Sequence, residues 1–488
     1  MNQRLRTLTL LHSNDLHGDF LAEELDDRLL GGVSMLSGYV SRVRDTEPNV
    51  LYAIAGDMLQ GSIIDREYRG LSTIGIMNLL APDVATIGNH EVDYGVGHLL
   101  FLEKCAKFPI VNANLYAKPT GTRLFSSHKV LEVGGMRVLF IGAVTAETLA
   151  KARQEEHIGE LVDLHDPADE VGRICNLYRG RGIDLTVLLT HIGFEEDKRL
   201  AARLDPAWGV DVIIGGHSHT LPDAPAEVNG ILIVQAGCGT DQIGRFDLTV
   251  DVKTNSVADW SWQCVPIDSG HCPRDPALEE LILHYKSHTD AKYGQVLTRF
   301  DRALTHPARN RQTELGGLFA DLLAGALGLD VMLLASGSVR VQALGPIVTL
   351  ADLKAAVPFD ETVTRVRVTG AQLRAMLAYM LREEAFAVGA HTEFYQLSEG
   401  LRAVWSRSRG CFTRLDWQGA PLREDTCLCV GLQRYHLDNF TKAFGMELPT
   451  GQGEPRLVST SCVDVLEERL AARPRFAAPA ADRLTVEP

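Results

Sequence analysis

Side chains that can bind metal ions follow five apolar segments of the chain. Each segment is about five or six residues long and rich in Val, Ile and Leu. Histidine nitrogens occur with carboxylate and amide oxygens and without thiolates, which suits Mn, Fe, Zn, Co or Mg better than a structural zinc site. The residues are Asp15 and His17 in NDLHG, Asp57 in GDMLQG, Asn89, His90, Glu91 and Asp93 in GNHEVD, His191 in THIG, and His217 and His219 in GGHSH.

Several such donors gathered at one site could hold two cations. A carboxylate can bridge two metal ions that lie roughly 3.5–4 Å apart. Such a pair lowers the pKa of bound water, orients the resulting hydroxide and neutralises charge on a phosphoryl group. If the donors converge, the chemistry they favour is hydrolysis of a phosphate ester.

Each motif also has an ordinary structural explanation when it is taken singly. Asp-x-His is common, Gly-Asp after a strand is usually a turn, and GGHSH could be a turn with two exposed histidines. GNHE is rarer, because polar groups placed directly after an apolar strand are costly to bury. The ordered occurrence of all five favours one shared site over five coincidences.

The apolar segments themselves predict buried strands. Short runs rich in branched residues and ended by turn residues are typical of strands, and longer segments between several of them can form helices. An α/β fold with a central sheet follows, and the carboxyl ends of its strands would line the ligand crevice. The runs are TLTLLHSND, NVLYAIAGD, DVATIGNHE, RVLFIGAVT, DLTVLLTHIG, DVIIGGHSH and ILIVQAG.

The second half of the chain has a different pattern. Residues 276–294 have helical periodicity between two regions of different character, which predicts a linker helix. Further helices are predicted at TELGGLFADLLAGAL and AQLRAMLAYMLREEAF, strands at VMLLAS and TVTRVRVTG, and a hairpin at 401–417. The Ala/Pro/Arg-rich end, 472–488, is expected to be poorly ordered.

Composition limits the classes of partner. The 488 residues include 48 Lys+Arg and 63 Asp+Glu, a net charge of −15, which argues against binding to long nucleic acids. No apolar stretch approaches the ~18 residues that cross a bilayer. The N-terminal apolar run is too short for a secretory signal, so we expect a first strand and a cytoplasmic protein. Nine cysteines without CxxC spacing predict reduced, mostly buried thiols, with Cys427 and Cys429 on one strand.

The ordered motifs resemble those of the calcineurin-like metallophosphoesterases, and in particular the branch of 5′-nucleotidases and 2′,3′-cyclic-nucleotide phosphodiesterases. The resemblance spans about residues 8–240 and is highly specific. It implies an α/β protein with an N-terminal β-sandwich flanked by helices and a C-terminal α/β substrate-binding domain. The implied division is a dimetal catalytic domain at 1–272, a linker helix at 273–295 that could act as a hinge, and a nucleoside-binding domain at 296–488.

The resemblance also implies roles for individual residues. One metal ion would bind Asp15, His17, Asp57 and His219, and the other would bind Asp57, Asn89, His191 and His217, with Asp57 as the bridge. Mn is the preferred ion, with Zn, Co, Fe or Mg as alternatives. His90 would stabilise charge at the phosphate, and Asp93 would hold its imidazole; alternatively, Asp93 could lie in the first turn of a helix. Glu91 has no assigned role.

In the second domain the resemblance is weaker. It implies Arg309 and Arg340 as anion contacts and Phe359 and Tyr435 as rings that stack on the base. Glu361 stands where the family usually has Asn, and the family's Gly-Gly-Asp-Gly segment is replaced by GLQRYHLDNF. As alternatives, Phe359 could be a core residue or a plug between the domains, and Tyr435 could belong to the core. The arginines could form surface ion pairs.

The function expected from these features is a dimetal phosphohydrolase that cleaves nucleotides, as a 5′-nucleotidase, a 2′,3′-cyclic-nucleotide phosphodiesterase or both. The substrate is a small nucleotide. Alternatives are a related hydrolase of nucleotide-sugar or dinucleotide pyrophosphates or of thiosulfonates, and a catalytically silent nucleotide-binding protein. The ester form, the base, the metal and the oligomeric state are left open by the sequence.

Overall fold

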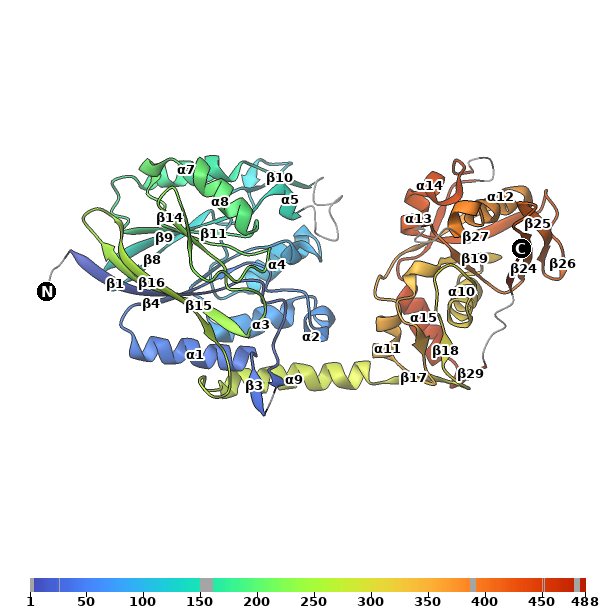
Figure 1. Cartoon of the computed structure of the whole chain (residues 1–488), viewed down its shortest axis with the longest axis horizontal. Coiled ribbons are helices and arrows are strands. Elements are labelled where there is room, and N and C mark those ends of the chain that lie inside the picture. Colours follow the sequence, from blue (N-terminus) through green and yellow to red (C-terminus); the bar gives the residue numbers. More distant parts are fainter. Residues whose placement is uncertain are drawn as a thin grey trace. The chain divides into compact units, whose positions relative to one another are not determined.

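The fold is taken from a computed structural model of the chain, which describes residues 4–25, 27–149, 161–386, 392–449, 451, 453–477 and 483–488. The chain separates into two compact units, Met1–Thr289 and Asp290–Pro488 (Figure 1). Helix α9 (Pro276–Tyr293) spans the boundary between them. The finer division at 272/273 and 295/296, and a hinge at this helix, remain predictions.

The first unit contains two large sheets. The strands that carry the site motifs run parallel within their sheets, β1 beside β4 and β4 beside β5 in one, and β11 beside β12 in the other. The first sheet has the order β16 (Ser256–Pro266), β15 (Gln242–Asp251), β1 (Leu5–Ser13), β4 (Val50–Ala55) and β5 (Val84–Thr86). The second has the order β13 (Ala226–Val228), β14 (Ile231–Val234), β12 (Val212–Ile214), β11 (Leu185–Thr190), β9 (Met136–Ala143) and β8 (His128–Val133).

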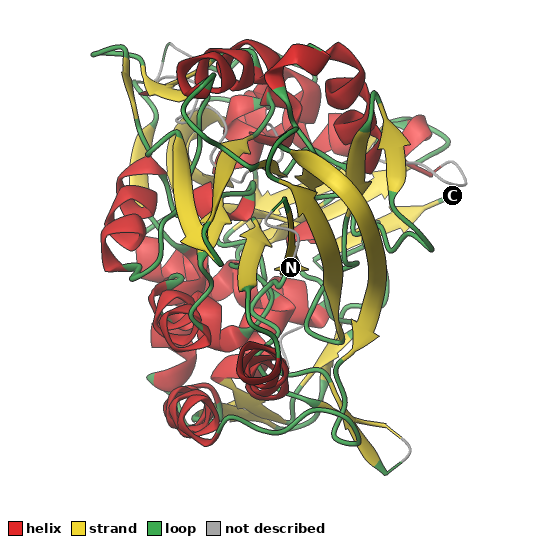
Figure 2. Cartoon of the chain, turned by 90° about the vertical axis from the view of Figure 1, so that its left-hand side faces the viewer, coloured by secondary structure: helices red, strands yellow, loops and turns green. Residues whose placement is uncertain are grey.

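These sheets pack face to face and are flanked by helices, as predicted. Leu8 and Leu10 of β1 share a buried cluster with Phe140 of β9 and Val187 of β11, whereas Leu11 faces the opposite side. This alternation is the period-two pattern of strands. Helices α1 (Val33–Thr46), α3 (Leu71–Leu80), α4 (Val96–Cys105) and α9 cover the outer face of the first sheet, and α7 (Pro167–Tyr178) and α8 (Phe194–Arg203) cover that of the second (Figure 2).

Short elements complete the first unit. They are β2 (Glu23–Leu25), β3 (Arg28–Leu30), α2 (Ile63–Glu67), η1 (His90–Val92), β6 (Leu115–Ala117), β7 (Thr122–Arg123), α5 (Ala146–Leu149), β10 (Val162–Leu164) and η2 (Pro206–Trp208).

The second unit is built around a five-stranded sheet of order β23 (Tyr395–Leu397), β19 (Val331–Ala335), β27 (Cys427–Gln433), β22 (Val363–Thr369) and β28 (Arg456–Ser459). A second sheet contains β26 (Ala420–Pro421), β25 (Cys411–Trp417), β24 (Leu401–Ser406) and β30 (Leu484–Glu487). Smaller sheets pair β21 (Ile347–Thr349), β17 (Val296–Phe300) and β29 (Arg475–Phe476), and β18 (Leu304–Thr305) with β20 (Ala343–Leu344). The helices are α10 (Glu314–Leu327), η3 (Ser336–Ser338), α11 (Leu350–Ala356), α12 (Gly370–Met380), η4 (Glu383–Phe386), α13 (Arg434–Asp438), α14 (Phe440–Phe444) and α15 (Cys462–Ala471).

All seven predicted strands of the first half are present, as β1, β4, β5, β9, β11, β12 and β14. The structure also confirms the helices predicted near 276–294 and 313–327, the strands β19 and β22, and the hairpin of β24 and β25. No helix within the described ranges has the length and hydropathy needed to cross a bilayer.

Three predictions are wrong in detail. The helix predicted to reach Phe386 ends at Met380, where the chain turns and buries Leu381 and Ala385. In the C-terminal stretch 472–488, β29 and β30 are ordered strands, so the expected poor order is wrong for these segments; residues 478–482 of this stretch lie outside the described residues. All nine cysteines are free, but only three are buried, whereas three are partly exposed and three are exposed. Cys427 and Cys429 do lie on one strand.

Candidate metal centre

The five predicted motifs occupy the loops that follow β1, β4, β5, β11 and β12. Parallel strands end at the same edge of a sheet, so each loop delivers its side chains to one rim. Five of the seven predicted ligands also have a left-handed backbone, with φ between 49° and 81°. Such residues cost of order 1–3 kcal/mol each and cluster at functional sites. They are Asp15, His17, Asp57, His217 and His219.

The first group of donors consists of Asp15, His17 and His219, whose ligand atoms all lie within 4.8 Å of one another. Asp15 is fully buried, and its Oδ1 lies 3.2 Å from Nε2 of His219 and 3.7 Å from Nε2 of His17. Nδ1 of His17 faces the carbonyl oxygen of Gln60 at 3.1 Å. This contact suits a proton on Nδ1 and leaves Nε2 as the donor atom that faces the site.

The second group consists of Asp57, His191 and His217. Nε2 of the fully buried His191 lies 3.1 Å from Oδ2 of Asp57 and 3.7 Å from Oδ1 of Asp15. Nδ1 of the same ring faces the carbonyl oxygen of Ala55 at 2.8 Å. Oδ1 of Asn89 lies 2.8 Å from Nδ1 of His217, so the amide oxygen lies beside the same group.

The donor set fits a pair of divalent cations. Among the described residues, Nε2 of His191 is buried and has no hydrogen-bond partner of suitable geometry. Burial lowers the pKa of His191, but the negative charge of Asp57 outweighs this effect and raises the pKa to about 10. Burial likewise raises the pKa of Asp57, and the charge of His191 reverses that shift and lowers it. The site therefore concentrates negative charge around nitrogen donors, as a cation requires.

His90 and Asp93 lie beside these groups. Nδ1 of His90 is 2.7 Å from Oδ2 of Asp93, and the His90 side chain is 30% exposed. Burial lowers the pKa of His90, but the hydrogen bond to Asp93 and the nearby negative charges raise it more. Helix α4 begins only at Val96, after Gly95, so Asp93 lies outside its first turn, contrary to the alternative interpretation.

Glu91, which the sequence left without a role, connects two of the loops. Its Oε2 accepts hydrogen bonds from the backbone N–H groups of Asp57 (2.9 Å) and Gly88 (2.6 Å). Its Oε1 accepts from those of Met58 (2.8 Å) and Leu59 (3.2 Å). Burial raises the pKa of Glu91 to about 7, with a further contribution from the charge of Asp57. The sequence signal was a carboxylate directly after a buried strand, which requires a partner.

Asn14 is a second positioning residue that the sequence analysis missed. Its Nδ2 donates to Oδ2 of Asp15 and to the carbonyl oxygen of Gly237, each at 2.7 Å, and its Oδ1 accepts from the N–H of Ala236 at 2.7 Å. The amide thereby fixes the Asp15 carboxylate against the loop after β14. The only signal in the sequence was its place beside Asp15.

Arg340, Phe359 and Tyr435 lie in the segments at one end of the second unit's main sheet, after β19, before β22 and after β27, and Arg309 lies in the loop between β18 and α10. Phe359 and Tyr435 are 50% and 51% exposed, so the interpretation of these rings as core residues is wrong. The guanidinium of Arg340 lies 4.8 Å from the centre of the Phe359 ring. Within the described part of the chain, neither Arg340 nor Arg309 forms an ion pair, contrary to that alternative.

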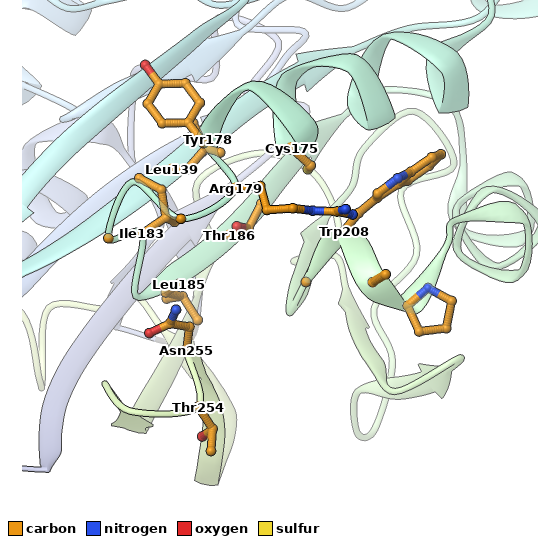
Figure 3. Close-up of a pocket in the computed structure, with 15 residues that line it drawn as sticks. Leu139, Cys175, Tyr178, Arg179, Ile183, Leu185, Thr186, Trp208, Thr254 and Asn255 are labelled. Atoms are coloured by element: carbon orange, nitrogen blue, oxygen red, sulfur yellow. The ribbon is translucent and has the colours of Figure 1, made fainter.

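A separate pocket of ≈300 Å³ lies elsewhere in the first unit (Figure 3). Tyr178, Arg179, Leu185, Thr186 and Trp208 are among its lining residues. Leu185 and Thr186 begin β11, so this pocket lies at the amino end of the strand that carries His191 at its carboxyl end. It takes no part in the metal centre.

Comparison with known proteins agrees with this geometry. The calcineurin-like phosphoesterase family matches residues 8–221, and the 5′-nucleotidase C-terminal domain matches residues 292–431. The chain belongs to the calcineurin-like phosphoesterases that carry a 5′-nucleotidase C-terminal domain. All the metal-capable motifs lie within the phosphoesterase match, and Arg309, Arg340 and Phe359 lie within the second.

Relatives of this family align over most of the chain. The 5′-nucleotidase of Mus musculus is 26% identical over 495 residues and covers 91% of this chain and 82% of its own. The snake venom 5′-nucleotidase of Naja atra is 27% identical over 449 residues, with 82% of each chain covered. A solved structure, the 5′-nucleotidase precursor of Thermus thermophilus, is 27% identical, with a TM-score of 0.60 and 99% of each chain covered.

Proposed function

We propose that this protein is a metal-dependent phosphoric ester hydrolase that cleaves nucleotides. The observation that carries the proposal is the convergence of three overlapping donor groups: Asp15, His17 and His219; His17, Asp57 and His90; and Asp57, His191 and His217. The family match supports the same reaction class, and the relatives named 5′-nucleotidase support the same substrate class.

Two divalent cations would be held at this rim. One ion would be bound by Asp15, His17, Asp57 and His219. The other would be bound by Asp57, Asn89, His191 and His217. Mn²⁺ is the proposed ion, with Zn, Co, Fe and Mg as alternatives, because mixed nitrogen and oxygen donors accept all of them. When bound, the ions would activate water as the nucleophile and neutralise charge on the phosphoryl group.

The protein's own groups would orient the ester and its protons. Asp93 holds His90 by its Nδ1, so Nε2 is left to contact a phosphoryl or leaving-group oxygen. The raised pKa of His90 favours the charged ring, which can stabilise developing negative charge. The His90 backbone N–H donates to Oδ1 of Asp57 at 2.9 Å and so ties the two residues together.

The second unit would bind the nucleoside. Phe359 and Tyr435 present half-exposed rings, on which a base can stack for roughly 1–3 kcal/mol per contact. Arg340 and Arg309, exposed and without ion pairs within the described ranges, would contact anionic groups. The proposed substrates are 5′-monophosphates, 2′,3′-cyclic nucleotides or both.

The test is an assay of metal-stripped protein reconstituted separately with Mn, Zn, Co and Mg. The substrates are 5′-AMP, 2′,3′-cyclic AMP, ADP-ribose and bis-p-nitrophenyl phosphate. We expect one of the first two to be cleaved far faster than the artificial diester. Cleavage of the artificial diester alone would refute the nucleotide substrate, and preferred cleavage of ADP-ribose would favour a pyrophosphatase.

A His90→Asn variant distinguishes a hydrolase from a silent binding protein. Loss of a positioned acid or base should lower kcat by about 10²–10⁴-fold, while binding of Mn²⁺ measured by calorimetry stays close to that of the wild type. Unchanged kcat in this variant would remove His90 from the mechanism.

A further inference from the structure

Three loops of the second unit meet at one end of its main sheet. Strand β19 runs parallel to β27, and β22 runs antiparallel to β27 with Val363 opposite Gln433. The segments after β19, before β22 and after β27 therefore emerge at the same edge. Gln433 joins two of them, because its Oε1 accepts from the N–H of Ala335 and the hydroxyl of Ser338, each at 3.1 Å.

Glu361 lies at the centre of this edge. Its Oε2 accepts a hydrogen bond from the backbone N–H of Tyr435 at 3.0 Å, and Phe359 precedes it by two residues. The carboxylate thus connects the two segments that carry the half-exposed rings. Glu361 itself is only partly buried, so part of its side chain is open to solvent.

The carboxylate of Glu361 has three acidic neighbours, Glu393, Asp360 and Asp438, and burial together with their charges raises its pKa. The Glu361 side chain forms no ion pair within the described residues. The nearby Asp438 is already paired with Arg434, at 2.6 Å. A carboxylate with free acceptor capacity beside two exposed rings calls for a ligand that brings hydrogen-bond donors.

We propose that Glu361 makes this site selective for guanine nucleotides, because its carboxylate can accept hydrogen bonds from both N1–H and N2–H₂ of a guanine base stacked on Phe359 or Tyr435. The inference rests on the proposed function and specifies its substrate class. Guanine presents two adjacent donors at this edge. Adenine and cytosine present one amino group beside a ring-nitrogen acceptor, which a carboxylate repels. Hypoxanthine keeps N1–H but lacks the amino group, and uracil has one N–H between two carbonyl oxygens.

The first experiment measures kcat/KM of the full chain with Mn²⁺ for the 5′-monophosphates GMP, IMP and AMP. The 2′,3′-cyclic nucleotides of guanine and adenine are compared in the same way. A good bidentate contact discriminates by about 10–100-fold. We expect GMP to exceed AMP by that factor, with IMP between them. Equal use of the three bases would overturn the inference and leave the proposed function in place. Cleavage of bis-p-nitrophenyl phosphate without any nucleotide would overturn both.

The second experiment uses Glu361→Gln and a matched control, Asp438→Asn. Glutamine keeps an oxygen for the N–H of Tyr435, so the loop contact survives, but its amide nitrogen now donates. We expect the GMP/AMP ratio to fall at least tenfold in Glu361→Gln. Asp438→Asn should keep the wild-type ratio, because Asp438 is already paired. An unchanged ratio in Glu361→Gln would limit Glu361 to a structural role and overturn the inference.

Discussion

The carboxylate of Glu91 should be necessary for both the stability and the metal affinity of the first unit. It receives four backbone N–H groups, two on each oxygen, from Asp57, Met58, Leu59 and Gly88. In Glu91→Gln only one oxygen remains, so the amide NH₂ of glutamine faces two of these donors. Above its pKa of about 7, Glu91 is ionised, and each hydrogen bond to a charged group contributes about 1.5–3 kcal/mol. Loss of two bonds therefore destabilises the unit by about 3–6 kcal/mol.

This change is measurable by scanning calorimetry. At about 2 °C per kcal/mol for a large domain, the transition of the first unit should fall by about 6–12 °C. The transition of the second unit, which lacks Glu91, should not move. Mn²⁺ affinity measured by titration calorimetry should also fall. The backbone that loses its hydrogen bonds to Glu91 carries Asp57, which is a proposed metal ligand.

Glu132→Gln is the matched control, because its carboxylate is 79% exposed and lies 3.9 Å from Nε of Arg137. It should change neither quantity. If Glu91→Gln unfolded within about 1 kcal/mol of the wild type and bound Mn²⁺ equally well, the four-donor argument would be refuted.

Three further predictions concern other parts of the molecule. Burial raises the pKa of Asp211 from 3.8 to about 7, so the folded state binds this proton more tightly than the unfolded state does. The free energy of unfolding of the wild type therefore falls as the pH rises from about 4 to about 7, and Asp211→Asn should remove up to about 4 kcal/mol of that fall. Equal pH profiles of thermal unfolding for the two proteins would contradict this. Arg483 is buried and donates two 2.6 Å hydrogen bonds to Asp321, so Arg483→Met should destabilise the second unit by about 3–5 kcal/mol. A loss of less than about 1 kcal/mol of unfolding free energy, measured by calorimetry, would argue against this role of the ion pair. Mn²⁺ at about 100 times its Kd should stabilise the first unit by about 2.7 kcal/mol, and Asp15→Asn should weaken this effect. A midpoint of thermal unfolding that does not change when Mn²⁺ is added to the wild-type protein would count against the metal centre.

The strands of the first unit could be predicted because their signal is local. Runs such as VLYAIA and LTVLLT are buried on both faces and end at turn residues, and each became a strand with these bounds. The metal-capable residues could be predicted for the same reason, since each follows such a run directly. The convergence of the loops was inferred from the rule for parallel strands, and the donor atoms do lie close together.

The residues that position the site could not be predicted, because their partners are distant in sequence. Glu91 contacts backbone groups up to 34 residues away, and Asn14 accepts from a residue 222 positions away. Arg483 lies in a stretch whose composition suggested disorder, yet an ion pair across 162 positions anchors it. Composition cannot report such contacts. The cytoplasmic location expected from the N-terminal sequence remains a prediction.

The left-handed residues of the metal centre explain why these positioning contacts exist. Asp15 and Asp57 adopt φ = 50°, a conformation that costs non-glycine residues free energy and persists only where surrounding contacts enforce it. Asn14 holds the side chain of Asp15, and Glu91 holds the backbone of Asp57. The strained turn in each case aims a carboxylate back over the strand end, toward His191. Relaxing either turn would move a ligand away from its partners, so the stabilising contacts and the proposed chemistry depend on the same few buried hydrogen bonds.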